Sequence, residues 1–179
     1  MMDLIKECLP RTRRIGTLFN PSEVNAVNFR EQLEKAAKKA GLECVSMPSN
    51  TPGDVNDAVL ALLQRGIDVV CQINDNMHDA AFAAIAQAAQ HARIPVFTFS
   101  AGLVYEGASV VLSNDHYDGG RESGLIAARI MRGEDPATIP YDGIRKTRLL
   151  VNPLAARKIG LTIPGSAINR ADVVVQTEK

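Results

Sequence analysis

The stretch from Arg14 to Glu23 has the sequence RIGTLFNPSE, a short apolar run followed by turn-forming residues. A run of this length that ends in Asn-Pro-Ser predicts a strand and then a loop. From about Glu23 to Ala40 the apolar residues recur at helical spacing, and Gly41 follows. We therefore expect an amphipathic helix that ends at this glycine and covers a sheet.

The same unit recurs along the first hundred residues. We expect further strands at 42–47, 67–73 and 94–99, one helix from Val55 to Gly66, and an alanine-rich helix at 77–91. Strand and helix alternate without a tight-hairpin signal, which indicates right-handed crossovers between parallel strands. The predicted fold class is therefore α/β, with a doubly wound parallel sheet.

The alternation becomes less regular after Ser100. We expect a strand at 108–112, a helix at 118–132 and a strand at 149–151. The connection from Glu134 to Lys146 contains two prolines and one glycine, and it is long for a compact domain. Such a connection indicates a chain that travels between two bodies.

Composition and charge argue against several classes of protein. The chain has 179 residues, 46% hydrophobic and 22% charged, enough for one domain or slightly more. Twenty basic and twenty acidic residues give a formal net charge of zero, which disfavours nucleic acid or an anionic membrane as a partner. No run approaches the roughly 18 apolar residues of a membrane span, and the start of the sequence lacks the layout of a signal peptide. Three cysteines without Cys-x-x-Cys spacing predict neither a disulfide framework nor a zinc site.

Polar residues follow four of the predicted strands, at the edge where open parallel sheets bind ligands. Two helices begin directly after these loops, and their free N–H groups favour a carboxylate or phosphate. Acidic side chains in the same loops are able to meet an ammonium group, so the site suits a zwitterion such as an amino acid. The alternative is that these residues are only N-caps and turn formers. The candidates are Asn20, Ser22 and Glu23, then Asn74, Asp75 and Asn76, then Phe99 and Ser100, and finally Asn114 and Asp115.

Catalytic and cofactor motifs give no support to an enzyme. The sequence has no G-x-x-x-x-G-K-[ST] loop, no G-x-G-x-x-G turn and no G-x-S-x-G elbow. The three histidines do not stand at metal-ligand spacing with other ligands. We therefore expect no cofactor, no metal and no catalytic residue.

Several motifs, taken in order, resemble the ABC-transporter substrate-binding proteins of the tryptophan/tyrosine-uptake type. The resemblance runs from about Leu9 to Val174, and it is the ordered spacing of individually weak motifs that makes it specific. The motifs are RIGTLFNPSE at 14–23, NDN at 74–76, IPVF at 94–97, DHYDGGR at 115–121, RGE at 132–134 with IP at 139–140, VNP at 151–153 and GLTIP at 160–164.

The resemblance implies an architecture similar to the type I periplasmic binding proteins, in which two Rossmann-like lobes close on a ligand in the cleft. By resemblance, residues 1–117 form the second ligand-binding lobe, and 118–146 form a helix and connection that return to a missing first lobe. Residues 147–179 would then be the returning strand and helix. The same ten candidate residues would face a small amino-acid-like solute, and an ABC permease would be the partner of an extracytoplasmic or periplasmic protein.

Two other functions are compatible with the same pattern. The chain would alternatively be a stand-alone sensory or regulatory ligand-binding domain of this fold, or a small flavodoxin-like or Rossmann enzyme. Because half of a two-lobed site retains half of the contacts, we expect only weak amino-acid binding or none that is detectable. We also expect that the predicted 118–132 helix exposes apolar side chains and promotes homo-oligomers. These side chains are Leu125, Ile126, Ile130 and Met131.

Overall fold

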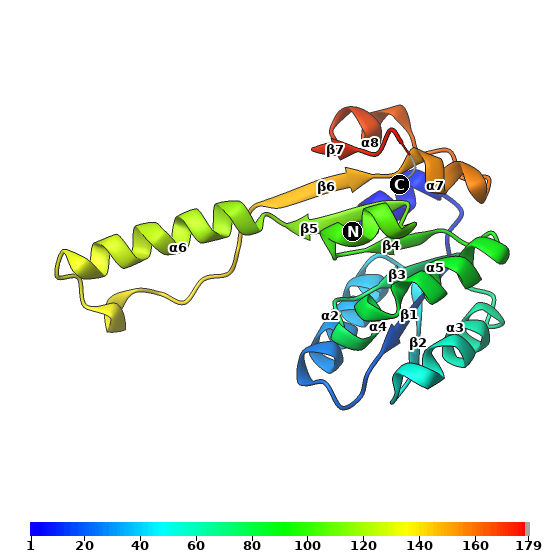
Figure 1. The fold of residues 1–179 in the computed structure, drawn as a ribbon, viewed down its shortest axis with the longest axis horizontal. Coiled ribbons are helices and arrows are strands. Elements are labelled where there is room, and N and C mark those ends of the chain that lie inside the picture. The colour runs from blue at the N-terminus through cyan, green and yellow to red at the C-terminus, as the bar shows by residue number, and fades with distance from the viewer. Residues whose placement is uncertain (178–179) are drawn as a thin grey trace.

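A computed structural model describes residues 1–177 of the chain, which form a seven-stranded sheet with helices on both faces (Figure 1). The sheet has the strand order β2-β1-β3-β4-β5-β6-β7. The elements are α1 (Met2–Cys8), β1 (Arg14–Phe19), α2 (Val24–Lys39), β2 (Glu43–Pro48), η1 (Pro52–Asp54), α3 (Val55–Leu63), β3 (Val69–Gln72), α4 (Asn76–Ala80), α5 (Phe82–His91), β4 (Val96–Thr98), η2 (Ala101–Glu106), β5 (Val110–Asn114), α6 (His116–Met131), η3 (Pro136–Thr138), β6 (Thr147–Val151), α7 (Pro153–Lys158), α8 (Gly165–Asn169) and β7 (Val173–Val174).

The first five strands are parallel to their neighbours, as the alternating pattern predicts. One pair differs from the prediction of a parallel sheet, because β5 and β6 are antiparallel, with Asn114 opposite Thr147. The reason is the path of the chain, which leaves the sheet at the end of β5, runs out along α6 and returns to the same edge. The α/β fold class with helices on both faces is confirmed.

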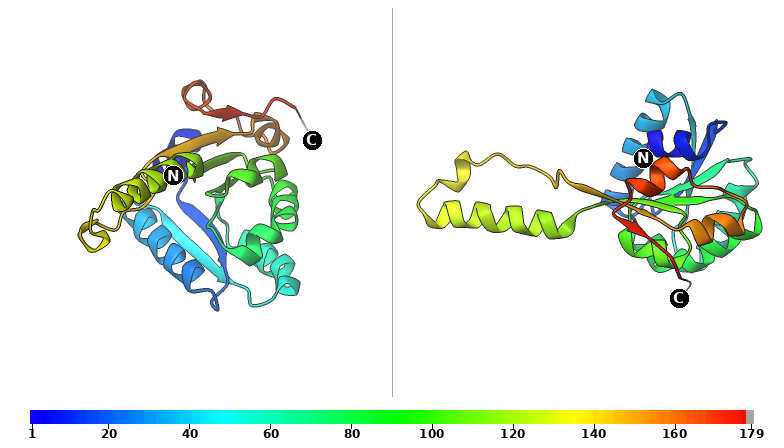
Figure 2. Two further views of the ribbon diagram at one scale, coloured as in Figure 1. Left: turned by 60° about the vertical axis from the view of Figure 1, so that its left-hand side comes forward. Right: turned by 90° about the horizontal axis from the view of Figure 1, so that it is seen from above.

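The two faces of the sheet carry separate apolar layers. On one face α1, α2 and α8 bury residues against the sheet, among them Ile5, Leu33 and Ala167. On the other face α3 and α5 do the same through Val59 and Ile85. The two groups of helices lie on opposite sides of the strands in the turned views (Figure 2). Strands buried on both faces explain the unbroken apolar runs of the sequence.

The predicted helix at 77–91 is divided into α4 and α5. Ala81 separates them with φ −97° and ψ 13°, and the N–H of Ala84 bonds to the carbonyl of Ala81 at 3.1 Å. This i to i+3 bond makes a tight turn in place of a continuous α-helical ladder. The break leaves both His78 and Phe82 fully buried.

The segment from α6 to β6 extends away from the rest of the molecule (Figure 1). Gly119 is the buried residue of α6, and the returning chain contacts it through Ile144. Arg129 forms an ion pair with Glu134 at the far end of the arm. The arm covers the predicted segment 118–146 and begins two residues earlier, because α6 starts at His116. Residues 178–179 of the predicted segment 147–179 lie outside the described residues.

Candidate functional site

The carboxyl ends of β1, β3, β4 and β5 carry the ten predicted residues, and seven of them, all polar, fall into two hydrogen-bonded groups. One group is centred on the carboxylate of Asp75 and the other on the hydroxyl of Ser100. Asn114 is the last residue of β5 and Asp115 follows it, and β5 is separated from β3 by β4 in the sheet. The structure therefore brings most, but not all, of the predicted residues together.

Asp75 is the centre of the first group and is only 2% exposed. Its Oδ2 accepts from the backbone N–H of Asn20 at 2.7 Å, and its Oδ1 accepts from the N–H groups of Met77 and His78 at 3.1 Å each. The last two bonds make Asp75 the N-cap of α4. Burial by itself would raise the pKa of Asp75, but the side-chain and backbone hydrogen bonds from His78 and Asn20 hold that pKa below 3.8.

Glu23 joins the loop after β1 to the loop after β3. One of its oxygens accepts from Asn20 Nδ2 at 3.3 Å, and the other accepts from Asn76 Nδ2 at 3.0 Å. Asn20 Oδ1 in turn accepts from the backbone N–H of Ser22 at 2.9 Å. These bonds fix the relative positions of two loops that are more than 50 residues apart in the sequence.

Two supporting residues, Ser49 and His78, were not predicted as part of the site. His78 Nδ1 lies 2.9 Å from Asp75 Oδ1, and Ser49 Oγ lies 2.6 Å from His78 Nε2. His78 is 0% exposed and Ser49 is 2% exposed. Their contact therefore fits a structural role, in which it holds together the loops after β2 and β3. The spacing of an aspartate and a histidine three residues later at a helix start is a sequence signal for the first contact. Nothing local in the sequence predicts the contact with Ser49.

Ser100 is the centre of the second group. Its hydroxyl lies 3.2 Å from Asn74 Oδ1 and 2.5 Å from Asp79 Oδ2. Asp79 was not predicted as a site residue, because α4 was expected to continue as an ordinary covering helix. Burial raises the pKa of the Asp79 carboxyl above its usual 3.8.

A cavity of about 390 Å³ opens beside these groups at the same edge of the sheet. Three predicted residues line it, namely Asn74, Phe99 and Asn114. The other seven predicted residues do not line it. Its remaining wall is mainly apolar and comes from α2, from the sheet and from the start of the chain: Met1, Met2, Phe29, Gln32, Leu33, Ala36, Ile73 and Leu112. An apolar wall with a few amide groups is the usual construction of a small-molecule site.

Asp115 is held away from the Asp75 group by contacts of its own. It caps α6 by accepting from the N–H of Asp118 at 3.1 Å, and it forms an ion pair with Lys146 at 3.1 Å. These two partners lower the pKa of Asp115. The predicted ammonium-binding role of this carboxylate is therefore opposed by a lysine that already neutralises it.

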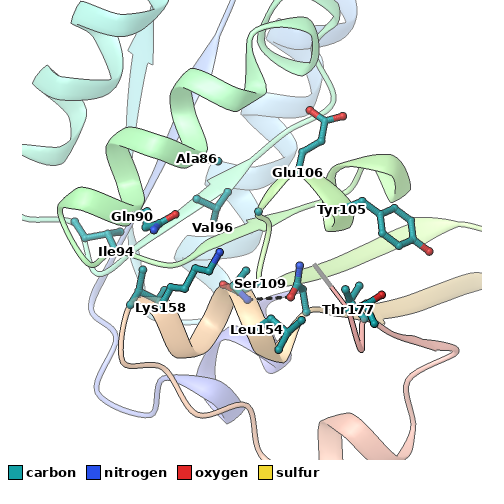
Figure 3. Close-up of a pocket in the computed structure, with 15 residues that line it drawn as sticks. Ala86, Gln90, Ile94, Val96, Tyr105, Glu106, Ser109, Leu154, Lys158 and Thr177 are labelled. Atoms are coloured by element: carbon teal, nitrogen blue, oxygen red, sulfur yellow. Dashed lines mark hydrogen bonds between the residues drawn. The ribbon is translucent and has the colours of Figure 1, made fainter. Parts of the chain in front are cut away.

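A second cavity of about 250 Å³ lies at the opposite edge of the sheet, near the starts of β4 and β5 (Figure 3). Its lining includes Gln90, Glu106, Ser109 and Lys158, and none of the predicted residues.

Within residues 1–177, no group of three or more histidine, cysteine or acidic side chains is placed to hold a metal ion. Likewise, no helix in this part of the chain is long and apolar enough to span a membrane.

Comparison with known proteins connects this geometry to a family. A tyrosine-binding protein of Clostridioides difficile is 28% identical over 151 residues, which are 84% of this chain and 44% of that protein. The crystal structure of a conserved domain protein from Vibrio cholerae has a TM-score of 0.85 and 32% identity, and the match covers 97% of this chain and 58% of the other. An ABC domain from Streptococcus pneumoniae in complex with L-Trp shares the fold, with a TM-score of 0.83, 24% identity and coverage of 97% and 60%.

The chain thus spans about half of the length of the proteins it matches. The sequence pattern of the family described as ABC transporter substrate binding protein matches residues 1–175, almost the whole chain. This chain belongs to the ABC transporter substrate-binding protein family.

Proposed function

We propose that this chain is the ligand-binding lobe of a solute-binding protein that delivers a small amino-acid-like solute to an ABC importer. The observation that carries the proposal is the cavity at the carboxyl edge of the sheet, where an apolar wall stands beside amide side chains. Family membership and the 28% identical tyrosine-binding relative support the same class of ligand. We infer a non-catalytic role, an extracytoplasmic location and an ABC permease as the partner.

The ten candidate residues divide by their contacts into three groups. We infer that Asn74, Phe99 and Asn114 contact the solute, because they line the cavity. We infer that Asn20, Ser22, Glu23 and Asn76 lie around the entrance to the site, whereas Asp75, Ser100 and Asp115 hold the loops through the bonds described above. An amide offers both donors and an acceptor, so this lining suits a ligand that carries a carboxylate and an ammonium group.

The extended arm fits a protein that closes around its ligand. We infer that residues 118–146 connect to a further lobe, while 1–117 and 147–179 form the lobe that carries the cavity. A ligand that touches both lobes only in the closed form shifts the population toward that form, and the importer then recognises the closed shape. This chain spans only about half of the length of its relatives but carries the cavity. We therefore infer binding by the chain alone that is weak but measurable at millimolar ligand, which is narrower than the sequence-based expectation of weak or undetectable binding.

The arm also exposes apolar surface. Leu125 is 55% exposed and Met131 is 87% exposed. Exposed apolar surface of this kind promotes association. We infer that the isolated chain forms homo-oligomers through α6, and light scattering that shows a strict monomer at high concentration contradicts this inference.

Titration with L-tryptophan tests the ligand class directly. The chain contains no tryptophan, so all indole fluorescence comes from the ligand. We expect a change in its emission with a Kd well above micromolar, and weaker binding in Phe99→Ala. Leu60→Ala removes an exposed side chain from α3, far from the cavity, and should bind like the original chain. A submicromolar Kd, equal binding by Phe99→Ala, or no change at millimolar ligand contradicts the proposal.

A further inference from the structure

Asp79 does not line the ligand cavity but is linked to it through Ser100 and Asn74, and the proposed ligand contacts assign it no role. It lies in α4, and its Oδ2 is 2.5 Å from the hydroxyl of Ser100. Its Oδ1 is buried and has no hydrogen-bond partner within the described residues. A buried anionic oxygen without a donor costs more free energy than a neutral carbonyl oxygen in the same place.

Ser100 stands between this carboxyl and the amide of Asn74. Its Oγ lies 3.2 Å from Asn74 Oδ1, and Asn74 lines the cavity. A serine hydroxyl has a single proton, so it donates to only one of these two acceptors at a time. The remaining contact becomes a hydrogen bond only if one of the two neighbours supplies a proton.

Two arrangements turn both contacts of Ser100 into hydrogen bonds. When Asp79 is protonated at Oδ2, it donates to Ser100 Oγ, and Ser100 donates to Asn74 Oδ1, so that the NH₂ group of the amide points away from Ser100. When Asp79 is ionised, Ser100 donates to Asp79, and the amide turns so that Asn74 Nδ2 donates to Ser100 Oγ. The two arrangements differ by one proton, which Asp79 takes from solvent or returns to it.

The surroundings of Asp79 favour the protonated form. Burial raises the pKa of Asp79, and the negative charges of Asp75, the N-cap of α4, and of Glu106 in η2 raise it further. The hydrogen bond from Ser100 and the nearby His78 act in the opposite direction and do not cancel the increase. The pKa of the exchange between the two arrangements is therefore higher than the usual pKa of an aspartate.

The geometry points to Asp79 as a positioning residue that, through Ser100, sets which end of the Asn74 amide faces the ligand cavity. That this amide contacts the solute rests on the proposed function. The exchange between the two arrangements of Asp79, Ser100 and Asn74, which we call the relay, requires no ligand. The protonated form offers N–H donors to a ligand carboxylate, and the ionised form offers the carbonyl oxygen to an ammonium group. Asp79 would thus determine which polar group of the solute Asn74 recognises.

The relay is tested by ¹⁵N NMR of the Asn74 side-chain amide, assigned with Asn74→Ala, between pH 4 and 8. We expect its resonances to titrate with an apparent pKa above 3.8 and to stop titrating in both Asp79→Asn and Ser100→Ala. In Asp79→Asn the new NH₂ group can donate to Ser100 and so imitate the protonated carboxyl. Asp57→Asn, an exposed aspartate of α3, is the matched control and should leave the titration unchanged. An amide that does not titrate in the original chain, or that still titrates in Asp79→Asn, overturns the relay.

The contact between the Asn74 amide and the solute is tested by a separate measurement. Affinity for L-tryptophan should change by about 2- to 10-fold across the amide titration, the effect of one hydrogen bond, and should not change in Asp79→Asn. If the amide titrates while the affinity stays constant, the relay is upheld and the contact between Asn74 and the solute is overturned. Absence of any tryptophan binding overturns the proposed ligand and leaves the amide titration as the test of the relay.

Discussion

Replacing Asp75 by asparagine should destabilise the protein strongly, although the two side chains have almost the same shape. Asp75 accepts three hydrogen bonds from backbone N–H groups at a position that is 2% exposed, and its Oδ1 also lies 2.9 Å from His78 Nδ1. An asparagine oxygen in the Oδ1 position still accepts from Met77 and His78, but its NH₂ group then meets the N–H of Asn20 at 2.7 Å. Two donors face each other there, and the partly buried N–H of Asn20 loses its partner.

The magnitude follows from these contacts. Losing a hydrogen bond to a charged group costs about 1.5–3 kcal/mol, and the two backbone bonds and the His78 contact that remain lose the carboxylate charge. We therefore expect Asp75→Asn to lower the free energy of unfolding by about 3 kcal/mol at pH 7, measured by urea unfolding. Asp57→Asn, at an exposed position, should change it by less than about 0.5 kcal/mol. Equal stability of the two variants would refute the assignment of Asp75 as the anchor of these loops.

The pH dependence gives this prediction a second check. The folded state lowers the pKa of Asp75, so its contribution is complete above the unfolded value near 3.8 and is lost as the pH falls through the lower folded value. The difference in stability between the original chain and Asp75→Asn should therefore shrink below about pH 4. A difference that is the same at pH 3 and pH 7 contradicts the lowered pKa.

Three further outcomes follow from the structure. Ser49→Ala leaves the buried His78 Nε2 without its partner at 2.6 Å, so urea unfolding should show a loss of about 1–3 kcal/mol. Gly16→Ala places a Cβ 2.5 Å from Ile67 Cδ1, and the overpacking should cost about 1–3 kcal/mol in the same assay. Burial raises the pKa of the thiols to about 11 or 12, so mass spectrometry should find no alkylation by iodoacetamide at pH 7 unless urea is added; full native modification would contradict this. The thiols are those of Cys8, Cys44 and Cys71.

Much of the fold was predictable because the signals are local. The apolar runs of β1 and β3 are bounded by turn residues, and the helices between them have an apolar stripe that ends at Gly41 or Gly66. Both glycines have positive φ, the conformation that stops a helix and that glycine adopts without strain. The antiparallel β6 was not predictable in this way, since its direction depends on where α6 carries the chain.

The site was predictable only to the level of the sheet edge. Sequence position shows that Asn20, Asp75 and Asp115 all follow strands, but not how far apart those strands lie. Adjacent strands are about 4.8 Å apart, and β5 is two places from β3, so Asp115 stays separate and pairs with Lys146. Contacts such as Ser49 with His78 join loops through tertiary packing, and no spacing within the sequence indicates them.

Mapping amino-acid binding onto the backbone with ¹⁵N NMR shows whether the carboxyl edge of the sheet is the solute-binding face. L-tyrosine and L-tryptophan would be added to their solubility limits. We expect chemical-shift changes concentrated at residues 20–23, 74–76, 99–100 and 114–115. Changes concentrated instead at the opposite edge, around Ser109 and Lys158, or no changes with either amino acid, would contradict it.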